Sequence, residues 1–208
     1  QRVEAPVLWN QYSRCRRRVA LQRGRPSTTG AGGGGAGGVG GCTPIARLAP
    51  AAEPRPVRTQ ALCEAAPELF GPCDEKSQEH YLFHGTSPAG ALGIIRDGFD
   101  IGRAGDGSHL LFGPGAYFAE CSSKFDEYAH PDEFSGLCAV LVCRVACGEL
   151  LRVEKRLEQD VLRDPTLVDR YDGVLGDREA CVGTYREFVV FDQEQVYPEY
   201  IVFYDRQQ

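Results

Sequence analysis

The sequence predicts an α+β fold in which short strands predominate and helices are few. Short apolar stretches typical of strands recur after residue 79, and only a few stretches show helical spacing of apolar residues. The two kinds of segment do not alternate regularly, which disfavours a doubly wound parallel sheet. With 208 residues, the chain is long enough to form one domain with a buried core.

The first 62 residues divide into a helix and a low-complexity stretch. Apolar residues between 7 and 21 recur at near-helical spacing, so we expect a helix over residues 5–21 in an N-terminal segment, 1–21. Residues 22–62 are rich in Gly and Pro and can bury little, so we expect a disordered insertion. The G-x-G-x-x-G pattern from Gly30 to Gly35 has no preceding strand and no following helix. We therefore interpret it as low complexity and not as a dinucleotide-binding motif.

Helix caps and apolar stretches predict the elements of the remaining chain. A helix is predicted between Ser87 and Gly98, because Ser87 suits an N-cap, Pro88 suits the first helical position and Gly98 suits the end of a helix. A second helix, capped by Ser122 or Ser123, reaches about residue 129. The predicted strands cover residues 81–84, 117–119, 137–145, 188–191 and 200–204. Residues 100–115 are expected to form a loop, and the charged residues 154–170 fit no element clearly.

The distribution of charge disfavours nucleic acid as a partner. The formal net charge is −6, with +4 in residues 1–75 and −10 in the remainder. An acidic body cannot neutralise phosphates, on which sequence-independent nucleic-acid binding depends. No apolar run is long enough to span a membrane. Because residue 1 is Gln and not Met, we expect the chain to be a fragment.

The nine cysteines indicate a reducing, intracellular environment, either nuclear or cytoplasmic. Cys138, Cys143 and Cys147 could suggest a zinc site, but they lie along a strand-like run. Strand alternation places the last two on one face and Cys138 on the other. No Cys-x-x-Cys pair occurs, so we interpret these cysteines as buried core residues.

Three short motifs place a His, a Tyr and a Glu beside strand-like residues. His84 lies in Tyr-Leu-Phe-His-Gly-Thr, Tyr117 in Gly-Ala-Tyr-Phe-Ala-Glu, and Glu187 in Tyr-Arg-Glu-Phe-Val-Val. Taken singly, each has a simpler explanation: a half-buried histidine, a core tyrosine and a surface glutamate. Their order and spacing, together with Gln-Val-Tyr-Pro-Glu-Tyr at residues 195–200, favour a shared functional site.

In these motifs the chain resembles the catalytic domain of the poly(ADP-ribose) polymerase family, and most of all its tankyrase-like members. The resemblance covers residues 79–151 and 171–205 well, and residues 8–12 weakly. It implies an ADP-ribosyltransferase fold: two packed antiparallel or mixed β-sheets, an NAD cleft between them and few peripheral helices. The catalytic core would then be residues 63–208.

The resemblance also assigns NAD-binding roles. His84 would hydrogen-bond a ribose hydroxyl, Gly85 would hold the nicotinamide carboxamide through its backbone, and Thr86 would complete the motif. Gly suits that position because a side chain would obstruct the approach of the backbone to a ligand. Tyr117 and Tyr128 would stack on opposite faces of the nicotinamide ring.

By the same resemblance, Glu187 is the catalytic glutamate, acting with His84 and Tyr117. It would contact the nicotinamide ribose and activate the acceptor, since NAD cleavage develops positive charge on the ribose. The match at residues 195–200 fixes the register of Glu187, so Glu194 and Glu199 are not expected to be catalytic. Lys124 is expected either to approach Glu187 or to be an ordinary surface lysine.

The chain departs from the family pattern at three points. Phe125 stands where the family commonly has a Ser that bonds the carboxamide, a loss worth about 0.5–1.5 kcal/mol of nicotinamide binding. The zinc ligands of tankyrase are missing, so we expect no metal. The helical regulatory subdomain of the DNA-activated members is missing as well.

We therefore expect an NAD-dependent ADP-ribosyltransferase that uses NAD as substrate and protein side chains as acceptors. The set His84, Tyr117 and Glu187 resembles that of chain-elongating members, so poly(ADP-ribose) could be the product. One alternative is a binding module for NAD or ADP-ribose with little turnover, which Phe125 favours and Glu187 opposes. Another is transfer to a nucleic-acid end, which the acidic body opposes. The sequence does not determine the oligomeric state.

Overall fold

The computed structural model describes residues 1–23, 55–103, 111–154, 166–179 and 183–206. Its helices and strands, in chain order, are α1 (Pro6–Arg23), α2 (Thr59–Ala65), η2 (Glu75–Ser77), β1 (Glu79–Thr86), α3 (Pro88–Asp97), η3 (Ile101–Arg103), β2 (Ala116–Ala119), α4 (Ser122–Asp126), β3 (Cys138–Ala146), β4 (Leu150–Val153), α6 (Thr166–Arg170), β5 (Gly173–Asp177), β6 (Arg186–Val190), η4 (Gln193–Gln195) and β7 (Val196–Tyr204). The expected α+β class with few helices is confirmed.

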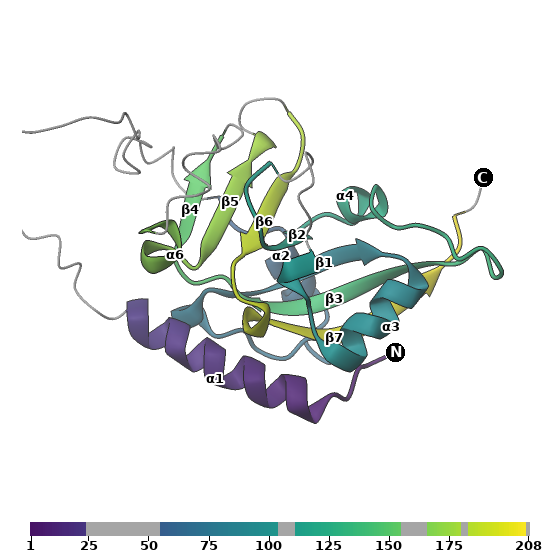
Figure 1. Cartoon of the computed structure of the whole chain (residues 1–208), viewed down its shortest axis with the longest axis horizontal. Helices are drawn as coiled ribbons and strands as arrows, with labels where there is room; N and C mark the ends of the chain where they lie inside the picture. Colours follow the sequence, from purple (N-terminus) through teal and green to yellow (C-terminus); the bar gives the residue numbers. More distant parts are fainter. Residues whose placement is uncertain (24–54, 104–110, 155–165, 180–182, 207–208) are drawn as a thin grey trace, which may run out of the picture.

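All seven strands belong to one mixed sheet, in the order β4-β5-β6-β2-β1-β3-β7 (Figure 1). We expected two packed sheets, and hydrogen bonding between β1 and β2 joins them into one. That junction is narrow: its register pairs Phe83 with Ala119, whereas β1 pairs with β3 along its whole length. Figure 1 shows β4, β5 and β6 rising steeply away from β3 and β7. The two halves therefore diverge on either side of the β1–β2 junction.

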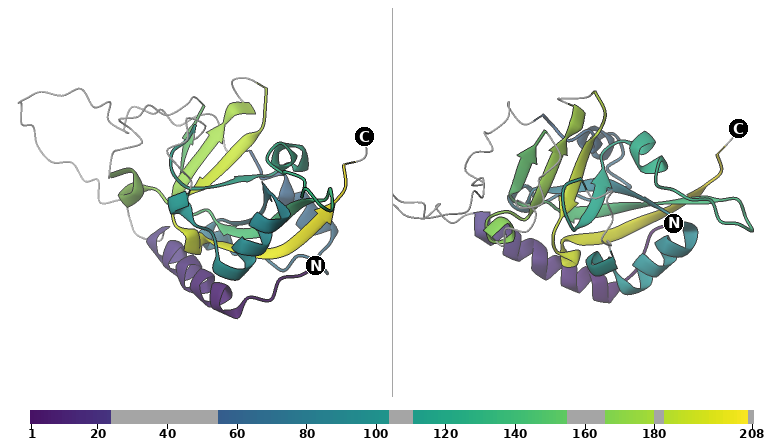
Figure 2. Two further views of the ribbon diagram at one scale, coloured as in Figure 1. Left: turned by 45° about the vertical axis from the view of Figure 1, so that its right-hand side comes forward. Right: turned by 45° about the horizontal axis from the view of Figure 1, so that its top comes forward.

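The core lies on both sides of β3, all nine residues of which are buried. Ala139, Leu141, Cys143 and Val145 alternate along one face and belong to the main apolar cluster. Cys138, Cys143 and Cys147 are all buried thiols, as expected of core cysteines. Figure 2 shows α1 and α3 on the same side of β3 and β7, with β4, β5 and β6 beyond the other side.

Local signals predicted α1, α3 and the start of α4, whereas α2 and α6 were not predicted. The N-terminal helix is one residue offset at its start and two longer at its end than expected. Ser87 caps α3 by accepting a hydrogen bond from the Gly90 N–H at 3.1 Å, and Gly98 follows the helix with φ of 87°. The second helix, α4, is shorter than expected and ends at Asp126.

Two strands were missed, and β6 and β7 begin earlier than expected. The missed strands, β4 and β5, pair in parallel and lie at one edge of the sheet. Gly173 and Gly176 lower the strand propensity of β5, which hid it in the sequence. Both glycines are required, because a Cβ at Gly173 would overlap the Val189 carbonyl and one at Gly176 would overlap the Phe112 ring.

A buried network of charges fastens α1 to the sheet. Glu79 accepts hydrogen bonds from Tyr12 and Arg16 of α1 and from Arg144 of β3. Arg144 also bonds Glu199, which accepts from Tyr81 at 2.8 Å. Glu199 is therefore part of the scaffold, in agreement with its expected exclusion from catalysis.

Most of the expected insertion, residues 22–62, lies outside the described residues, including Gly30 to Gly35. Residues 55–62 are described, and the expected disorder is wrong for them, because they contact the sheet and include the start of α2. Within the described residues, no helix is both long and apolar enough to cross a membrane.

Candidate active site

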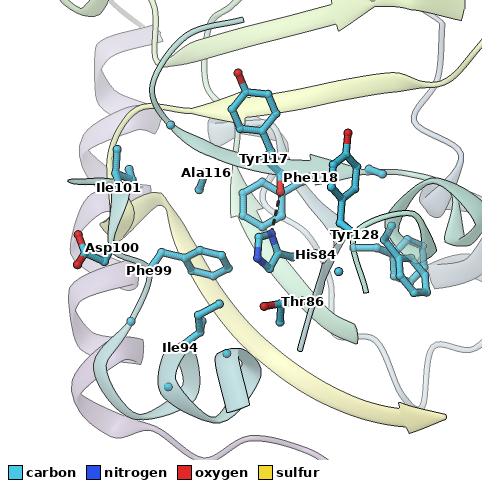
Figure 3. Close-up of a pocket in the computed structure, with 18 of the residues that line it drawn as sticks. His84, Thr86, Ile94, Phe99, Asp100, Ile101, Ala116, Tyr117, Phe118 and Tyr128 are labelled. Carbon is cyan, nitrogen blue, oxygen red and sulfur yellow. Dashed lines mark hydrogen bonds between the residues drawn. The ribbon is translucent and has the colours of Figure 1, made fainter. Parts of the chain in front are cut away.

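A cavity of about 800 Å³ opens where β1 and β2 part (Figure 3). Its walls come from β1, α3, the segment after α3, β2, α4 and β6. His84, Gly85, Thr86, Tyr117, Tyr128 and Glu187 all line it. The structure thus brings together every residue that the sequence assigned to the site, from positions more than 100 residues apart in the chain. The volume lies in the range of small-molecule sites in proteins.

His84 is held between two aromatic rings and a backbone carbonyl. Its ring centroid lies 4.9 Å from that of Phe99 and 5.6 Å from that of Phe118. Nδ1 lies 2.9 Å from the Tyr117 carbonyl oxygen, so this nitrogen must carry the proton and donate it. Burial lowers the pKa of His84, and the bond to the carbonyl only partly opposes this. In the neutral ring, Nε2 is then an acceptor.

The bond from His84 also explains why the sheet opens at Gly85. In a continued β1–β2 ladder, the register of Phe83 with Ala119 would place Tyr117 opposite Gly85. The Tyr117 carbonyl instead accepts from the His84 side chain. The backbone of Gly85 consequently lines the cavity. A Cβ at Gly85 would overlap the carbonyl oxygen of Phe125, so glycine is required for α4 to pack here.

Two tyrosines stand at the mouth of the cavity, with their hydroxyl groups pointing away from His84 (Figure 3). Tyr117 accepts a hydrogen bond from the Phe112 N–H at 3.1 Å and donates one to the Gly113 carbonyl at 2.8 Å. Burial raises its pKa to about 12, so its hydroxyl stays protonated. Tyr128 is 55% exposed and is fixed through its hydroxyl, 3.2 Å from Lys124 Nζ. Tyr117 is thus rigid, while Tyr128 presents an accessible ring.

Glu187 supplies a buried carboxylate to the cavity. It is 5% exposed, and Lys124 Nζ lies 3.1 Å from its Oε1, with Arg178 Nη1 at 3.9 Å. Oε1 itself is fully buried, and its contact with the ammonium group of Lys124 is an ion pair. Glu187 thus places a carboxylate, held beside Lys124, in the wall of the cavity.

Lys124 approaches Glu187, so the first of its two expected placements is the one observed. It is buried, and it also pairs with Glu127 at 2.8 Å. Burial lowers the pKa of Lys124, but its polar contacts with Glu127, Tyr128 and Glu187, together with the charge of Glu187, outweigh this effect, and the net pKa is raised. Lys124 thus remains a cation beside the carboxylate.

Phe125 turns its side chain to the core at the position where the resemblance expects a hydroxyl. Its ring centroid lies 5.3 Å from that of Phe83 and 6.2 Å from that of Tyr204. The aromatic packing stabilises α4 against β1, and it offers no donor to a carboxamide. Among the described residues, no group of three or more His, Cys, Asp or Glu could hold a metal ion.

Sequence reasoning missed the aromatic support of His84 and the basic neighbour Arg178. Strand alternation in Ala116–Ala119 could have indicated that Phe118 faces away from Tyr117. Phe99 follows the end of α3, where no pattern in the sequence assigns a direction. Arg178 comes from the end of β5, the strand that its glycines concealed.

The cavity is thus lined by a glycine at an open sheet edge, a neutral imidazole, two tyrosine rings and a buried carboxylate. The family model described as the poly(ADP-ribose) polymerase catalytic domain matches residues 60–206. The chain therefore belongs to this family.

Curated relatives agree with this assignment. Mouse protein mono-ADP-ribosyltransferase PARP10 is 32% identical over 136 residues, which are 64% of this chain and 14% of the relative. Mouse protein mono-ADP-ribosyltransferase PARP11 is 30% identical over 142 residues, which are 60% of this chain and 41% of the relative. Chicken poly [ADP-ribose] polymerase 1 is 24% identical over 163 residues, which are 67% of this chain and 16% of the relative. The chain thus spans less than half the length of each.

Proposed function

We propose that this chain transfers ADP-ribose from NAD to protein side chains and releases nicotinamide. The observation that carries the proposal is that the carboxylate of Glu187, paired with Lys124, and the neutral imidazole of His84 belong to the wall of one cavity. Two such acceptors in one cavity suit a ligand that presents two hydroxyl groups, as the nicotinamide ribose of NAD does. Protein acceptors are supported by the relatives that are named as protein mono-ADP-ribosyltransferases.

Each residue then has a physical role. The nicotinamide ring stacks between Tyr117 and Tyr128, and its carboxamide bonds the backbone of Gly85 beside Thr86. His84 Nε2 accepts a hydrogen bond from one ribose hydroxyl. Glu187 accepts from another and lies where positive charge develops as the glycosidic bond breaks. The same carboxylate deprotonates the acceptor group.

The length of the product is a separate question with two candidate answers. A single transfer is supported by the mouse relatives, which are named as mono-ADP-ribosyltransferases. Chain elongation is supported by Glu187 together with His84 and Tyr117, the set that resembles elongating members. The prediction of a tankyrase-like subtype rests on the order and spacing of the sequence motifs together and stays a prediction. A ladder of labelled product supports elongation, and a single band supports single transfer.

The test is to incubate the chain with labelled NAD beside Glu187→Gln and a matched control, Glu194→Gln. Glu194 lies in η4 and does not line the cavity. We expect wild type and Glu194→Gln to release nicotinamide and label protein, and Glu187→Gln to lose about 10²–10⁴-fold in rate. Equal rates for Glu187→Gln and wild type would remove Glu187 from its role.

The same assay separates the two alternatives. A binding module would hold NAD without releasing nicotinamide, and Phe125, which offers no hydroxyl, is the feature in its favour. Transfer to RNA in place of protein would indicate a nucleic-acid acceptor.

We retain an intracellular location, nuclear or cytoplasmic, as a prediction from the unpaired cysteines.

We also propose that the chain divides into an N-terminal helix (1–21), an insertion (22–62) and a catalytic core (63–208). The family match from residue 60 to 206 supports a core of about this extent. Helix α2 begins at Thr59, a few residues before the proposed boundary.

A further inference from the structure

Three strands end at one row of charged side chains directly beside Glu187. Asp177, the last residue of β5, is the register partner of Arg186, the first residue of β6. Glu120 follows the last residue of β2, Ala119, which is the partner of Glu187. Glu120 therefore lies opposite Arg186. We call Asp177, Arg186 and Glu120 the charged row.

Arg186 is the centre of this row, and every nitrogen of its side chain is bonded. The residue is 4% exposed. Nε and Nη2 donate to the two carboxylate oxygens of Glu120, at 2.5 and 2.6 Å. Nη1 and Nη2 also donate to the backbone carbonyls of Arg55 and Pro56, at 3.0 and 2.8 Å. A lysine has one ammonium group and cannot reproduce this fork.

The row is covered by the four residues 55–58, which we call the strap. Arg55 pairs with Asp177 at 3.1 Å, and its carbonyl accepts from Arg186. The Arg58 N–H donates to Glu120 at 2.7 Å. The strap thus contacts the ends of β5, β6 and β2 in turn.

Glu187 depends on this arrangement because the residues beside it in the two neighbouring strands give its side chain little to pack against, and its ion pair with Lys124 holds only the end of the side chain. Its register partners are Gly176 in β5 and Ala119 in β2, which present almost no side chain. Adjacent residues of a strand point to opposite faces, so the row and the strap lie behind Glu187, away from the cavity. Glu187 is also the second residue of β6, and chain segments at strand ends open most easily. The row holds the three ends together at that point.

We propose that Arg186 is a positioning residue: through the charged row and the strap it fixes the start of β6, and thereby aims the carboxylate of Glu187. The expected effect on kcat rests on the proposed function, because it assumes that Glu187 acts on NAD. The contacts of the row and the strap do not depend on that function.

The experiment compares Arg186→Lys with Arg144→Lys in the full chain. Arg144 is an equally buried arginine, 6% exposed, that pairs with Glu79 and Glu199 on the other half of the sheet. Both variants keep the charge and lose the fork. Rates of nicotinamide release are measured below the unfolding transition of both proteins. Amide hydrogen exchange is followed over residues 186–190 and, for comparison, over residues 138–146.

For Arg186→Lys we expect kcat to fall about 10–100-fold with KM for NAD within about twofold of wild type, because a small misplacement of a reacting group has this effect. Exchange should quicken at residues 186–190 and not at 138–146. Arg144→Lys should keep the wild-type kcat. In a Glu187→Gln background, Arg186→Lys should lower the residual rate no further, because it acts through Glu187.

The proposal is overturned if Arg186→Lys leaves kcat within about twofold of wild type, or lowers it no more than Arg144→Lys does. A further fall in the Glu187→Gln background overturns it as well. If wild type releases no nicotinamide, the proposed function fails and exchange alone decides. In that case, unchanged amide exchange at residues 186–190 in Arg186→Lys would contradict the role of the charged row in supporting β6. Faster exchange at these residues would support that role.

Discussion

The protonation state of His84 follows from one bond to a backbone carbonyl. Because the Tyr117 oxygen can only accept, Nδ1 carries the proton and Nε2 offers a lone pair to the cavity. A second proton would turn Nε2 into a donor and place a charge between Phe99 and Phe118. Burial accordingly lowers the pKa of His84 below its ordinary value. The function proposed for His84 requires the neutral ring.

We therefore predict a pH dependence for His84. The unfolded chain takes up a proton near pH 6.5, and the folded chain does so only at lower pH. Between these points the unfolded state binds more protons, so this contribution to stability is lost as the pH falls. kcat/KM for NAD should hold down to about pH 6.5 and decline only below it. His84→Gln should lack this decline of kcat/KM, and His130→Gln, at an exposed position, should keep it. A decline of kcat/KM with its midpoint above pH 6.5 would contradict the prediction.

At the scale of elements, the site depends on how closely β1 approaches α4. Gly85 touches the Phe125 carbonyl so closely that no side chain fits between strand and helix. The same contact brings Lys124 and Tyr128 to the cavity, since both belong to α4 and the turn after it. Packing of these two elements thus assembles one wall of the site.

The close contact between β1 and α4 predicts that alanine substitutions at two glycines change the stability of the protein in opposite directions. Gly85→Ala should lower the free energy of unfolding by about 2–3 kcal/mol, because a backbone carbonyl must move to admit the methyl group. Gly93→Ala is the matched control: it lies within α3 and its added Cβ would meet no atom within 4 Å. Alanine favours a helix interior, so Gly93→Ala should raise stability by about 0.5–1 kcal/mol. Urea denaturation measures both, and equal effects would contradict the proposed contact.

At the scale of the whole molecule, two charged networks fasten peripheral segments to the sheet. One joins α1 to β1, β3 and β7 through Glu79, Arg144 and Glu199. The other joins the strap to β5, β6 and β2. Each network links residues far apart in the chain, so each ties the folding of a peripheral segment to the sheet that carries the site.

The first network predicts the effect of removing one hydroxyl. Tyr12→Phe should lower the free energy of unfolding by about 1.5–3 kcal/mol, because Glu79, a buried and charged acceptor, loses the hydrogen bond that the Tyr12 hydroxyl donates. Val7→Ala, on the exposed side of the same helix, should change stability by less than about 0.5 kcal/mol. Chemical denaturation followed by fluorescence of Trp9, which packs on Tyr12, would measure both. An effect of Tyr12→Phe as small as that of Val7→Ala would contradict the role of the network.

Much of the fold and of the candidate site was predictable because it depends on local signals. Ser87, Pro88 and Gly98 delimit α3 through backbone chemistry that needs no partner. The long apolar run of β3 had to be buried wherever it lay. By contrast, β5 was missed because Gly173 and Gly176 are explained only by the carbonyl and the ring that press against them. The short strand β4, which pairs with β5, was missed as well.

The sequence by itself determined the α+β class of the domain, because caps and apolar periodicity are properties of neighbouring residues. Its motifs, through their resemblance to a known family, also predicted which residues surround the cavity. Tertiary structure alone decided that the sheet opens at Gly85, that Lys124 and Arg178 meet at Glu187, and that Arg186 holds the end of β6. These features join residues from opposite ends of the domain. They arise from close packing and from pairing of buried charges, which no local pattern specifies.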